Sequence, residues 1–300
     1  MNLTNQPLVS IVIPCYNHGN FVQDSIQSVI DQTYQNIELI IIDDGSKDDS
    51  IAKIQELVSK CEERFTRFEF RYRPNKGLCA TLNESLGFCR GDFFSVLASD
   101  DLIVKEKIEI QVAYLQKNPK SGGVFGNVQL INNDKYIPIE NKKTSQVKKH
   151  NFEDVINHNF NLWAPTQLVR LGLVTQVNGF NESVILEDWY MWLKITELGY
   201  SLDSMEEAFA FYRRHDSNMS GQIDRMHKGR LDIIDLFKPD YDVTESLANV
   251  YLVTANDYLV YDKSKSFRYF ILAIKSHYKL FYKMKFNLKI FKFLFKFMVR

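Results

Sequence analysis

The first 117 residues alternate short apolar runs with segments of helical period, and this alternation restricts the possible folds more than any other feature. The predicted strands are VSIVIP (9–14), IELIII (37–42), FEFRY (68–72) and DFFSVLA (92–98). Apolar residues recur at helical spacing in residues 19–32, 46–58, 77–90 and 104–117. Because strands that alternate with helices form parallel sheets covered by helices, we expect an α/β fold. IELIII is apolar apart from Glu38, as in a strand buried on both faces.

Three of these strands run directly into polar residues. The first ends in PCYN (14–17), the second is followed by Asp43 and Asp44, and the fourth is followed by Asp100 and Asp101. Ligands of parallel sheets bind beyond the carboxyl ends of the strands, so we expect the three loops to share one site. Adjacent carboxylates suit Mg²⁺ or Mn²⁺, especially when a phosphate supplies further oxygens. The alternative is that each Asp pair only forms a turn or caps the next helix.

The rest of the chain is less regular. GGVFGNVQLI (122–131) and FAFYRRH (209–215) predict strands, LEDWYMWLKITELG (186–199) predicts a helix, and residues 132–150 predict a polar loop. The pattern is helical from residue 244 onward. The 300 residues hold 37 basic and 37 acidic side chains, yet none of the acidic ones follows Lys263. We expect an acidic catalytic domain over residues 1–225 and a helical segment with a basic tail over 226–300.

Several protein classes lack support in the sequence. There is no GxGxxG after the first strand and no GxxxxGK[ST], which argues against a dinucleotide oxidoreductase and a P-loop NTPase. The four cysteines form no CxxC pair, so we expect reduced thiols in a cytosolic compartment. The N-terminus does not resemble a signal peptide, and no uncharged apolar run reaches 18 residues.

Several segments together resemble family 2 glycosyltransferases of the GT-A fold. They are the stretch from VSIVIPCYN to IIIDDGSKDDS (9–50), NKGLCATLNESLGFCRGDFFSVLASDDL (75–102), NGFNESVILEDWYMWLKITELGY (178–200) and YRRHDSNMS (212–220). The resemblance covers about residues 7–220 and involves five motifs in order. It implies a GT-A domain, a Rossmann-like and mainly parallel sheet flanked by helices, that binds a nucleotide sugar.

The resemblance also implies residues that contact the donor nucleotide. Pro14, Tyr16 and Asn17 would lie along the base and the ribose. Asp44 would accept a hydrogen bond from the uracil imide, which favours a UDP-sugar, while Asp43 would support the loop. Further donor-binding candidates are Lys76 and Gly77, in a helix-entry turn, and Asp100, near the ribose.

The same resemblance implies a metal site and a catalytic base. Asp101 would ligate the Mn²⁺ or Mg²⁺ that bridges the donor diphosphate, and His215 would reach the metal or the phosphates. Asp188 would take the proton of the acceptor hydroxyl, so that a single displacement inverts the anomeric carbon. Candidates on the acceptor side are Glu187, Trp163 and Trp189.

Each of these roles has a plain structural alternative. Asp188 could cap its helix, His215 could be a surface histidine, and the tryptophans could pack in the core. At the level of function, the alternatives are a nucleotidyltransferase, which would release pyrophosphate, and a protein that binds sugar nucleotides without turnover.

The C-terminal stretch KFNLKIFKFLFKFMVR (285–300) carries lysines spaced four, three and four residues apart, which would form one basic stripe on a helix. Such a basic, aromatic helix favours an anionic membrane surface; a helical cap or a dimer contact is the alternative. Nucleic acid is not an expected partner, because the apolar face is too large. The resemblance implies a saccharide or lipid-linked acceptor in bacterial surface polysaccharide or lipopolysaccharide assembly. The expected location is the bacterial cytoplasm, at the cytoplasmic face of the inner membrane.

Overall fold

The computed structural model describes residues 6–131, 146–215, 218–277, 292–294 and 296–298. Contacts between residues group the chain into two compact units. The first unit comprises residues 1–152, 161–182 and 187–214, and the second comprises 153–160, 183–186 and 215–300. The domain boundary between residues 225 and 226 stays a prediction, because a unit defined by contacts is not by itself a functional domain.

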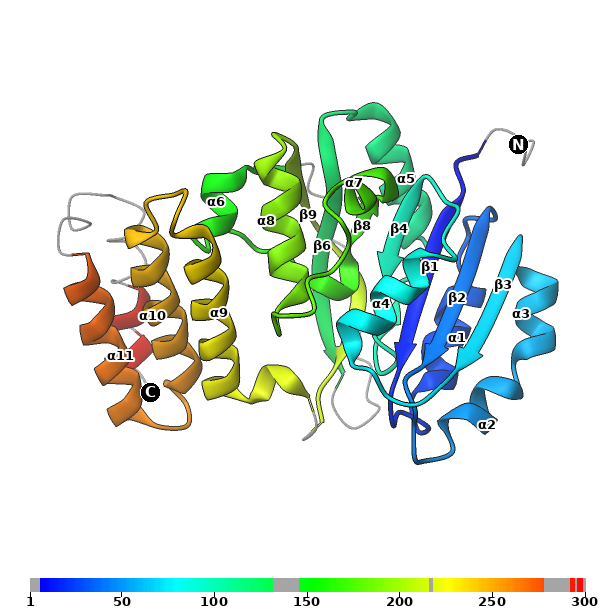
Figure 1. The fold of residues 1–300 in the computed structure, drawn as a ribbon, viewed down its shortest axis with the longest axis horizontal. Helices are drawn as coiled ribbons and strands as arrows, with labels where there is room; N and C mark the ends of the chain where they lie inside the picture. Colours follow the sequence, from blue (N-terminus) through cyan, green and yellow to red (C-terminus); the bar gives the residue numbers. More distant parts are fainter. Residues whose placement is uncertain (1–5, 132–145, 216–217, 278–291, 295, 299–300) are drawn as a thin grey trace. The chain divides into compact units, whose positions relative to one another are not determined.

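The first unit is built on a nine-stranded sheet with the order β3-β2-β1-β4-β8-β6-β9-β5, in which β7 pairs with β9 (Figure 1). The strands are β1 (Val9–Cys15), β2 (Ile37–Asp43), β3 (Arg67–Tyr72), β4 (Phe93–Val96), β5 (Leu102–Ile103), β6 (Ser121–Ile131), β7 (Lys148–His150), β8 (Leu168–Arg170) and β9 (Ser201–Arg213). Strands β1 to β4 are parallel neighbours, which confirms the expected α/β class. Their carboxyl ends therefore lie at one edge of the sheet.

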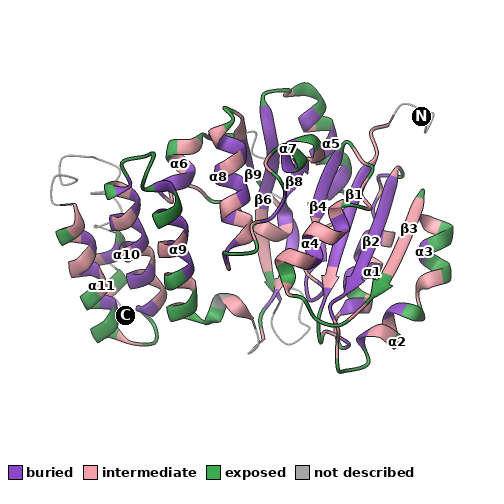
Figure 2. Cartoon of the chain, viewed as in Figure 1, coloured by how far each residue is buried: buried purple, intermediate pink, exposed green. Residues whose placement is uncertain are grey.

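Helices cover both faces of the parallel strands. The helical elements of this unit are α1 (Val22–Ile30), α2 (Ser50–Gln55), α3 (Val58–Arg64), α4 (Leu78–Leu86), α5 (Lys107–Lys117), η2 (Ala164–Thr166), α7 (Leu171–Gln176) and α8 (Glu187–Glu197). Side chains of α1, α3 and α5 form one core with alternate residues of β1 and β2, whereas α4 contacts the same strands outside that core. Every residue of β2 is buried (Figure 2), which is why residues 39–42 are apolar without alternation. The buried Glu38 of this strand is paired with Arg67.

The structure differs from the expectation in several elements. The helix expected over 46–58 is two short helices, α2 and α3, with a break at Glu56 and Leu57. Strands β7 and β8 were not predicted, because three residues are too few to show a period. Strand β9 begins at Ser201 instead of 209; its first, more polar half is held by pairing with both β6 and β7. Of the loop expected over 132–150, residues 132–145 lie outside the described residues.

The second unit is helical, as predicted. Helices α9 (Ile223–Phe237), α10 (Thr244–Tyr258) and α11 (Lys263–Ser276) follow η3 (Met219–Gly221), and α6 (Phe152–Ile156) joins this unit at its second residue. Phe293 packs into the apolar core of α10 and α11, and its ring stacks on that of Phe270 at 4.6 Å. The remainder of the predicted membrane-binding segment lies largely outside the described residues. No helix of the described part of the chain is long and apolar enough to cross a bilayer.

Candidate active site

The loops after β1 and β2 are tied together at the carboxyl edge of the sheet. Asn17 has a positive φ of 55°; its backbone N–H donates to Ser46 Oγ at 2.8 Å, and its side-chain oxygen accepts from the Lys47 N–H at 2.7 Å. Pro14, in β1, lies opposite Ile42 in β2, and the side chain of Tyr16 is 47% exposed. Tyr16 and Asn17 thus lie in a loop that is hydrogen-bonded to the loop after β2, and Pro14 lies at the end of the strand that leads into it.

Asp43 is a fully buried carboxylate that holds the β2 loop. Its oxygens accept hydrogen bonds from the backbone N–H groups of Gly45 and Ser46, at 3.1 and 2.8 Å, and from Ser46 Oγ at 2.6 Å. A carboxylate that accepts several N–H and O–H groups is satisfied without leaving the interior. The role of Asp43 in donor binding stays a prediction. Its hydrogen bonds to Gly45 and Ser46 are those expected of a residue that supports the loop.

Asp44 holds a different segment, the turn that enters α4. Its two oxygens accept from the backbone N–H groups of Lys76 and Gly77, at 2.8 and 2.9 Å, and from the Arg73 guanidinium. Gly77 has a φ of +92°, which a residue with a side chain rarely adopts, so glycine fits this turn. The structure therefore brings Lys76 and Gly77 beside Asp44.

Arg73 was not singled out in the sequence, yet it is central to this part of the site. Its guanidinium bridges Asp44 and Glu84, with a distance of 2.6 Å to the Glu84 carboxylate, and also donates to Thr81 Oγ1 at 2.9 Å. The signal was available: Arg73 directly follows β3 and therefore lies at the same sheet edge as the Asp pairs.

The two carboxylates after β4 point in different directions. Asp101 is 1% exposed, and its carboxylate accepts the backbone N–H of Arg213 at 2.9 Å. Burial, and then the charge of Asp100, raise the pKa of Asp101 well above its usual range. The Asp100 carboxylate instead faces His18, with 4.0 Å between Oδ2 and Nε2. The Asp101 carboxylate thus makes a buried structural contact with β9, whereas the Asp100 carboxylate is directed toward the loop after β1.

His18 also escaped the sequence reasoning, although it directly follows PCYN. Its Nδ1 lies 2.7 Å from Ser99 Oγ, which leaves Nε2 directed toward Asp100. A histidine oriented through one ring nitrogen, with the other facing a carboxylate, is the usual arrangement of a metal ligand. A divalent cation therefore fits these residues chemically.

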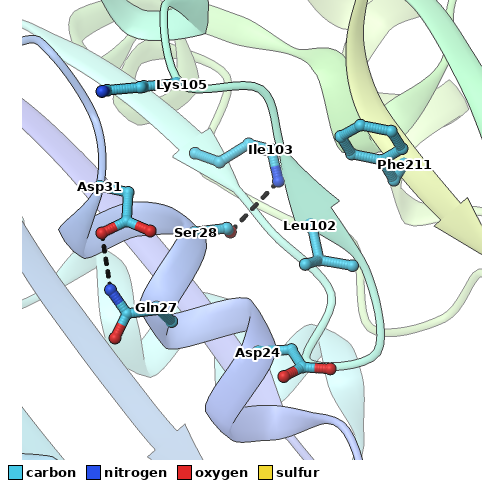
Figure 3. Close-up of a pocket in the computed structure, with 8 residues that line it drawn as sticks. All are labelled: Asp24, Gln27, Ser28, Asp31, Leu102, Ile103, Lys105 and Phe211. Carbon is cyan, nitrogen blue, oxygen red and sulfur yellow. Dashed lines mark hydrogen bonds between the residues drawn. The ribbon is translucent and has the colours of Figure 1, made fainter. Parts of the chain in front are cut away.

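Arg213, in β9, connects the loop of Asp100 and Asp101 to helix α1 through hydrogen bonds. Besides its backbone contact with Asp101, its side chain donates to the Asp100 carbonyl at 3.0 Å and to the Asp24 carboxylate at 3.1 Å. Asp24 also lines a hollow of about 310 Å³ between α1 and β5 (Figure 3). The other lining residues are Gln27, Ser28, Asp31, Leu102, Ile103, Lys105 and Phe211. This hollow contains none of the predicted site residues.

The N-terminus of α8 carries the predicted base. Burial, and then the charge of Asp188, raise the pKa of Glu187 to about 8, and burial also raises the pKa of Asp188. Both carboxylates act electrostatically on the thiol of Cys79 in α4, whose pKa burial raises to about 12. The start of α8 therefore lies near the helix that Gly77 opens.

The tryptophans divide between core and surface. Trp189 and Trp192 are each 3% exposed, which places them in the core, whereas Trp163 is 38% exposed. His215 belongs to the second unit, where its backbone N–H donates to the Asn218 side chain at 2.6 Å; its role as a metal ligand stays a prediction.

The raised pKa of Glu187 predicts how stability depends on pH. Its pKa in the folded protein is about 8, above the unfolded value of about 4.5, so its contribution to stability is complete below pH 4.5 and is lost as pH rises through 8. Glu187→Gln cannot ionise. We expect the variant to match the wild type in urea denaturation at pH 5 and to be more stable at pH 9. Lower stability of the variant at pH 9 would contradict the assigned burial.

Comparison with known proteins identifies the family. The model of "Glycosyl transferase family 2" matches residues 10–170. An uncharacterised glycosyltransferase of Haemophilus influenzae is 30% identical over 232 residues, which cover 73% of this chain and 69% of the relative. The Escherichia coli protein "UDP-Glc:alpha-D-GlcNAc-diphosphoundecaprenol beta-1,3-glucosyltransferase WfgD" is 28% identical over 273 residues, covering 90% of this chain and 95% of WfgD.

In five further uncharacterised glycosyltransferases from Haemophilus and Rickettsia, the match covers only 17% to 44% of the relative. Among solved structures, a mannosyltransferase from Pyrobaculum calidifontis, in complex with GDP-Man and Mn²⁺, superposes with a TM-score of 0.62 at 13% identity. The match covers 99% of this chain and 87% of that one, and at this identity it shows the GT-A fold alone. The chain belongs to glycosyl transferase family 2.

Proposed function

We propose that the chain transfers a sugar, with inversion, from a UDP-sugar to a hydroxyl of a saccharide or lipid-linked saccharide, using a divalent cation. The observation that carries the proposal is the grouping at one sheet edge. Asp44 is held beside the turn into α4, the Asp100 carboxylate faces His18, and the carboxylates that open α8 act on Cys79 in α4. These contacts support a donor site at this edge of the sheet, with the base at the start of α8 close to it.

The donor nucleotide would lie along the β1 and β2 loops. A carboxylate has about four acceptor positions, and Asp44 uses three of them for Arg73, Lys76 and Gly77. The fourth remains for the imide N–H of uracil, which would distinguish uracil from cytosine. The exposed ring of Tyr16 offers a surface on which the base can stack.

Asp100 and His18 would hold the cation, and Asp101 would fix the loop that carries Asp100. This assignment differs from the sequence-based one, in which Asp101 is the ligand, and it follows from where the two carboxylates point. The cation, Mn²⁺ or Mg²⁺, supplies neutralisation of the charge that develops on the departing diphosphate. His215 remains a further candidate ligand.

Asp188 would accept the proton of the acceptor hydroxyl. Its elevated pKa keeps it a stronger base than an ordinary carboxylate, while Glu187, with a pKa of about 8, is largely neutral at pH 7. A neutral neighbour does not repel the anionic donor. Inversion needs one base, whereas retention by double displacement would need a nucleophile as well.

The acceptor and the cellular setting rest on the relatives. WfgD matches this chain over nearly its whole length, and its name gives a diphosphoundecaprenol-linked acceptor. We therefore propose a lipid-linked saccharide acceptor in bacterial surface polysaccharide assembly, with Trp163 as a platform for its sugar ring. Because Phe293 packs into the core of α10 and α11, the contribution of residues 285–300 would be their lysines, which would favour the anionic cytoplasmic face of the inner membrane.

A thermal-shift screen tests the donor assignment. UDP with Mn²⁺ should stabilise the protein by about 2.7 kcal/mol at a hundredfold excess over Kd, and GDP or CMP should stabilise it less. Asp44→Asn should abolish the preference for UDP, because an amide group cannot accept at all of these positions. The exposed Asp31→Asn serves as the control. Equal shifts by all nucleotides on the wild type would refute the uracil contact.

Product analysis tests the reaction itself. Incubation with UDP-glucose and a GlcNAc-diphosphate lipid should release UDP and form a β-linked disaccharide. Release of pyrophosphate would indicate a nucleotidyltransferase, and binding without turnover over a broad panel of donors and acceptors would indicate a binding protein.

A further inference from the structure

Lys107, the first residue of α5, is a fully buried lysine without a carboxylate partner among the described residues. Its Nζ donates to Ser95 Oγ in β4 and to the backbone carbonyl of Gln167, each at 3.0 Å. Burying an ammonium with only neutral acceptors is unfavourable, and an apolar side chain of similar size would cost less. A simple packing role does not account for this residue.

The two acceptors of Lys107 belong to parts of the site that are distant in sequence. Ser95 lies in β4, which leads into the loop of Asp100 and Asp101. Gln167 lies between η2 and β8, directly after the turn that begins at the exposed Trp163. Ser95 Oγ also donates to the Gln167 carbonyl at 2.7 Å, which closes a triangle of hydrogen bonds around Lys107.

Gln167 extends this connection to α8. Its side-chain oxygen accepts the indole N–H of Trp192 at 3.3 Å, and the Trp192 ring packs edge-on against Phe125 at 5.2 Å between ring centres. Trp192 follows Asp188 by four residues, so the two lie on one face of the helix. Anchoring Trp192 therefore fixes the rotation of the helix that carries the proposed base.

We propose that Lys107 is a positioning residue. Its hydrogen bonds hold the turn at Trp163 and helix α8, which carries Asp188, in a fixed position against β4, the strand that precedes Asp100 and Asp101. This inference rests on the proposed function. The ammonium makes both hydrogen bonds charge-assisted, and such bonds are about twice as strong as neutral ones. Loss of the Lys107 charge would make the positions of Trp163 and Asp188, on the acceptor side of the site, less well fixed. The loops after β1 and β2, which would bind the donor, would stay in place.

Protonation of Lys107 should make this link depend on pH. Burial alone lowers the pKa of Lys107 to about 7. The groups that face Nζ from β4 and from the segment before β8 are the neutral Ser95 and Gln167. Of the nearby carboxylates, Glu109 on α5 accepts from Thr33, and Asp92, before β4, accepts from the Leu8 N–H. No charged group contributes to the shift.

The Trp192 indole N–H resonance in a ¹H–¹⁵N spectrum tests the proposal without any substrate. In the wild type it should shift with a midpoint near pH 7. Lys107→Met should abolish this titration, whereas Thr196→Val should keep it. Thr196 is a matched control, because its buried hydroxyl bonds only within α8, to the carbonyls of Trp192 and Leu193. A titration that persists in Lys107→Met, or that is missing in the wild type, would overturn the proposal.

Activity gives the second measurement. Lys107→Met should keep the UDP and Mn²⁺ thermal shift of the wild type, while kcat/KM for the acceptor lipid falls about 10- to 100-fold and loses its pH dependence near 7. Loss of the UDP shift would mean general damage and would count against a positioning role. If the indole titrates as expected but no lipid is turned over by the wild type, the proposed function fails and the positioning link stands.

Discussion

Asp188→Asn should transfer sugar about 10²- to 10⁴-fold more slowly than the wild type, which corresponds to about 2.7 to 5.5 kcal/mol of transition-state stabilisation. The amide has the shape of the carboxylate but cannot take a proton from the acceptor hydroxyl. The Asp188 carboxylate also accepts the Trp189 N–H at 2.6 Å, and the amide oxygen can preserve that contact. The change therefore removes the base and keeps the helix start.

The measurement is kcat from UDP release, with donor binding followed separately by thermal shift. Glu182→Gln is the matched control, because Glu182 is an exposed carboxylate that also acts on the Cys79 thiol. We expect the control to keep its rate and both variants to keep the UDP shift. Turnover of Asp188→Asn near the wild-type value, with intact folding, would show that another group accepts the proton.

The parallel half of the sheet could be predicted because its signals are local. β1 and β2 are apolar runs of ordinary strand length, and the Asp pairs mark where strands end. β8 has only three residues and derives its place from pairing with β4 and β6. No local pattern carries that information, since its partners lie far away in the sequence.

The same distinction holds for the site. Asp44 and Asp100 were found from strand ends, but the partners that orient them come from elsewhere in the chain. Arg73 lies 29 residues from Asp44, and the Nε2 atom of His18 faces a carboxylate 82 residues further along. The sequence also could not decide which of two adjacent aspartates points inward. That choice depends on the Arg213 backbone N–H, which only the fold brings to Asp101.

This choice leads to the second prediction of large effect. Asp100→Asn should reduce metal-stimulated transfer by about 10²- to 10³-fold, as expected when one charged contact to the developing negative charge is lost. Asp100 is 7% exposed, its carboxylate faces His18, and an amide in its place keeps the same shape. We therefore expect Asp100→Asn to fold normally and to need far more Mn²⁺ for half-maximal rate.

Asp101→Asn is the informative comparison, because it changes the neighbouring carboxylate by the same one atom. The amide oxygen can still accept the Arg213 N–H, and burial already disfavours the charged carboxylate, so the unfolding temperature should change little. The Mn²⁺ dependence of the activity should change much less than in Asp100→Asn. Rate as a function of Mn²⁺ concentration separates the two variants, and thermal denaturation checks that both fold. If Asp101→Asn shows the larger loss of metal affinity at unchanged stability, then Asp101 is the ligand, and its buried orientation must change when donor and cation bind together.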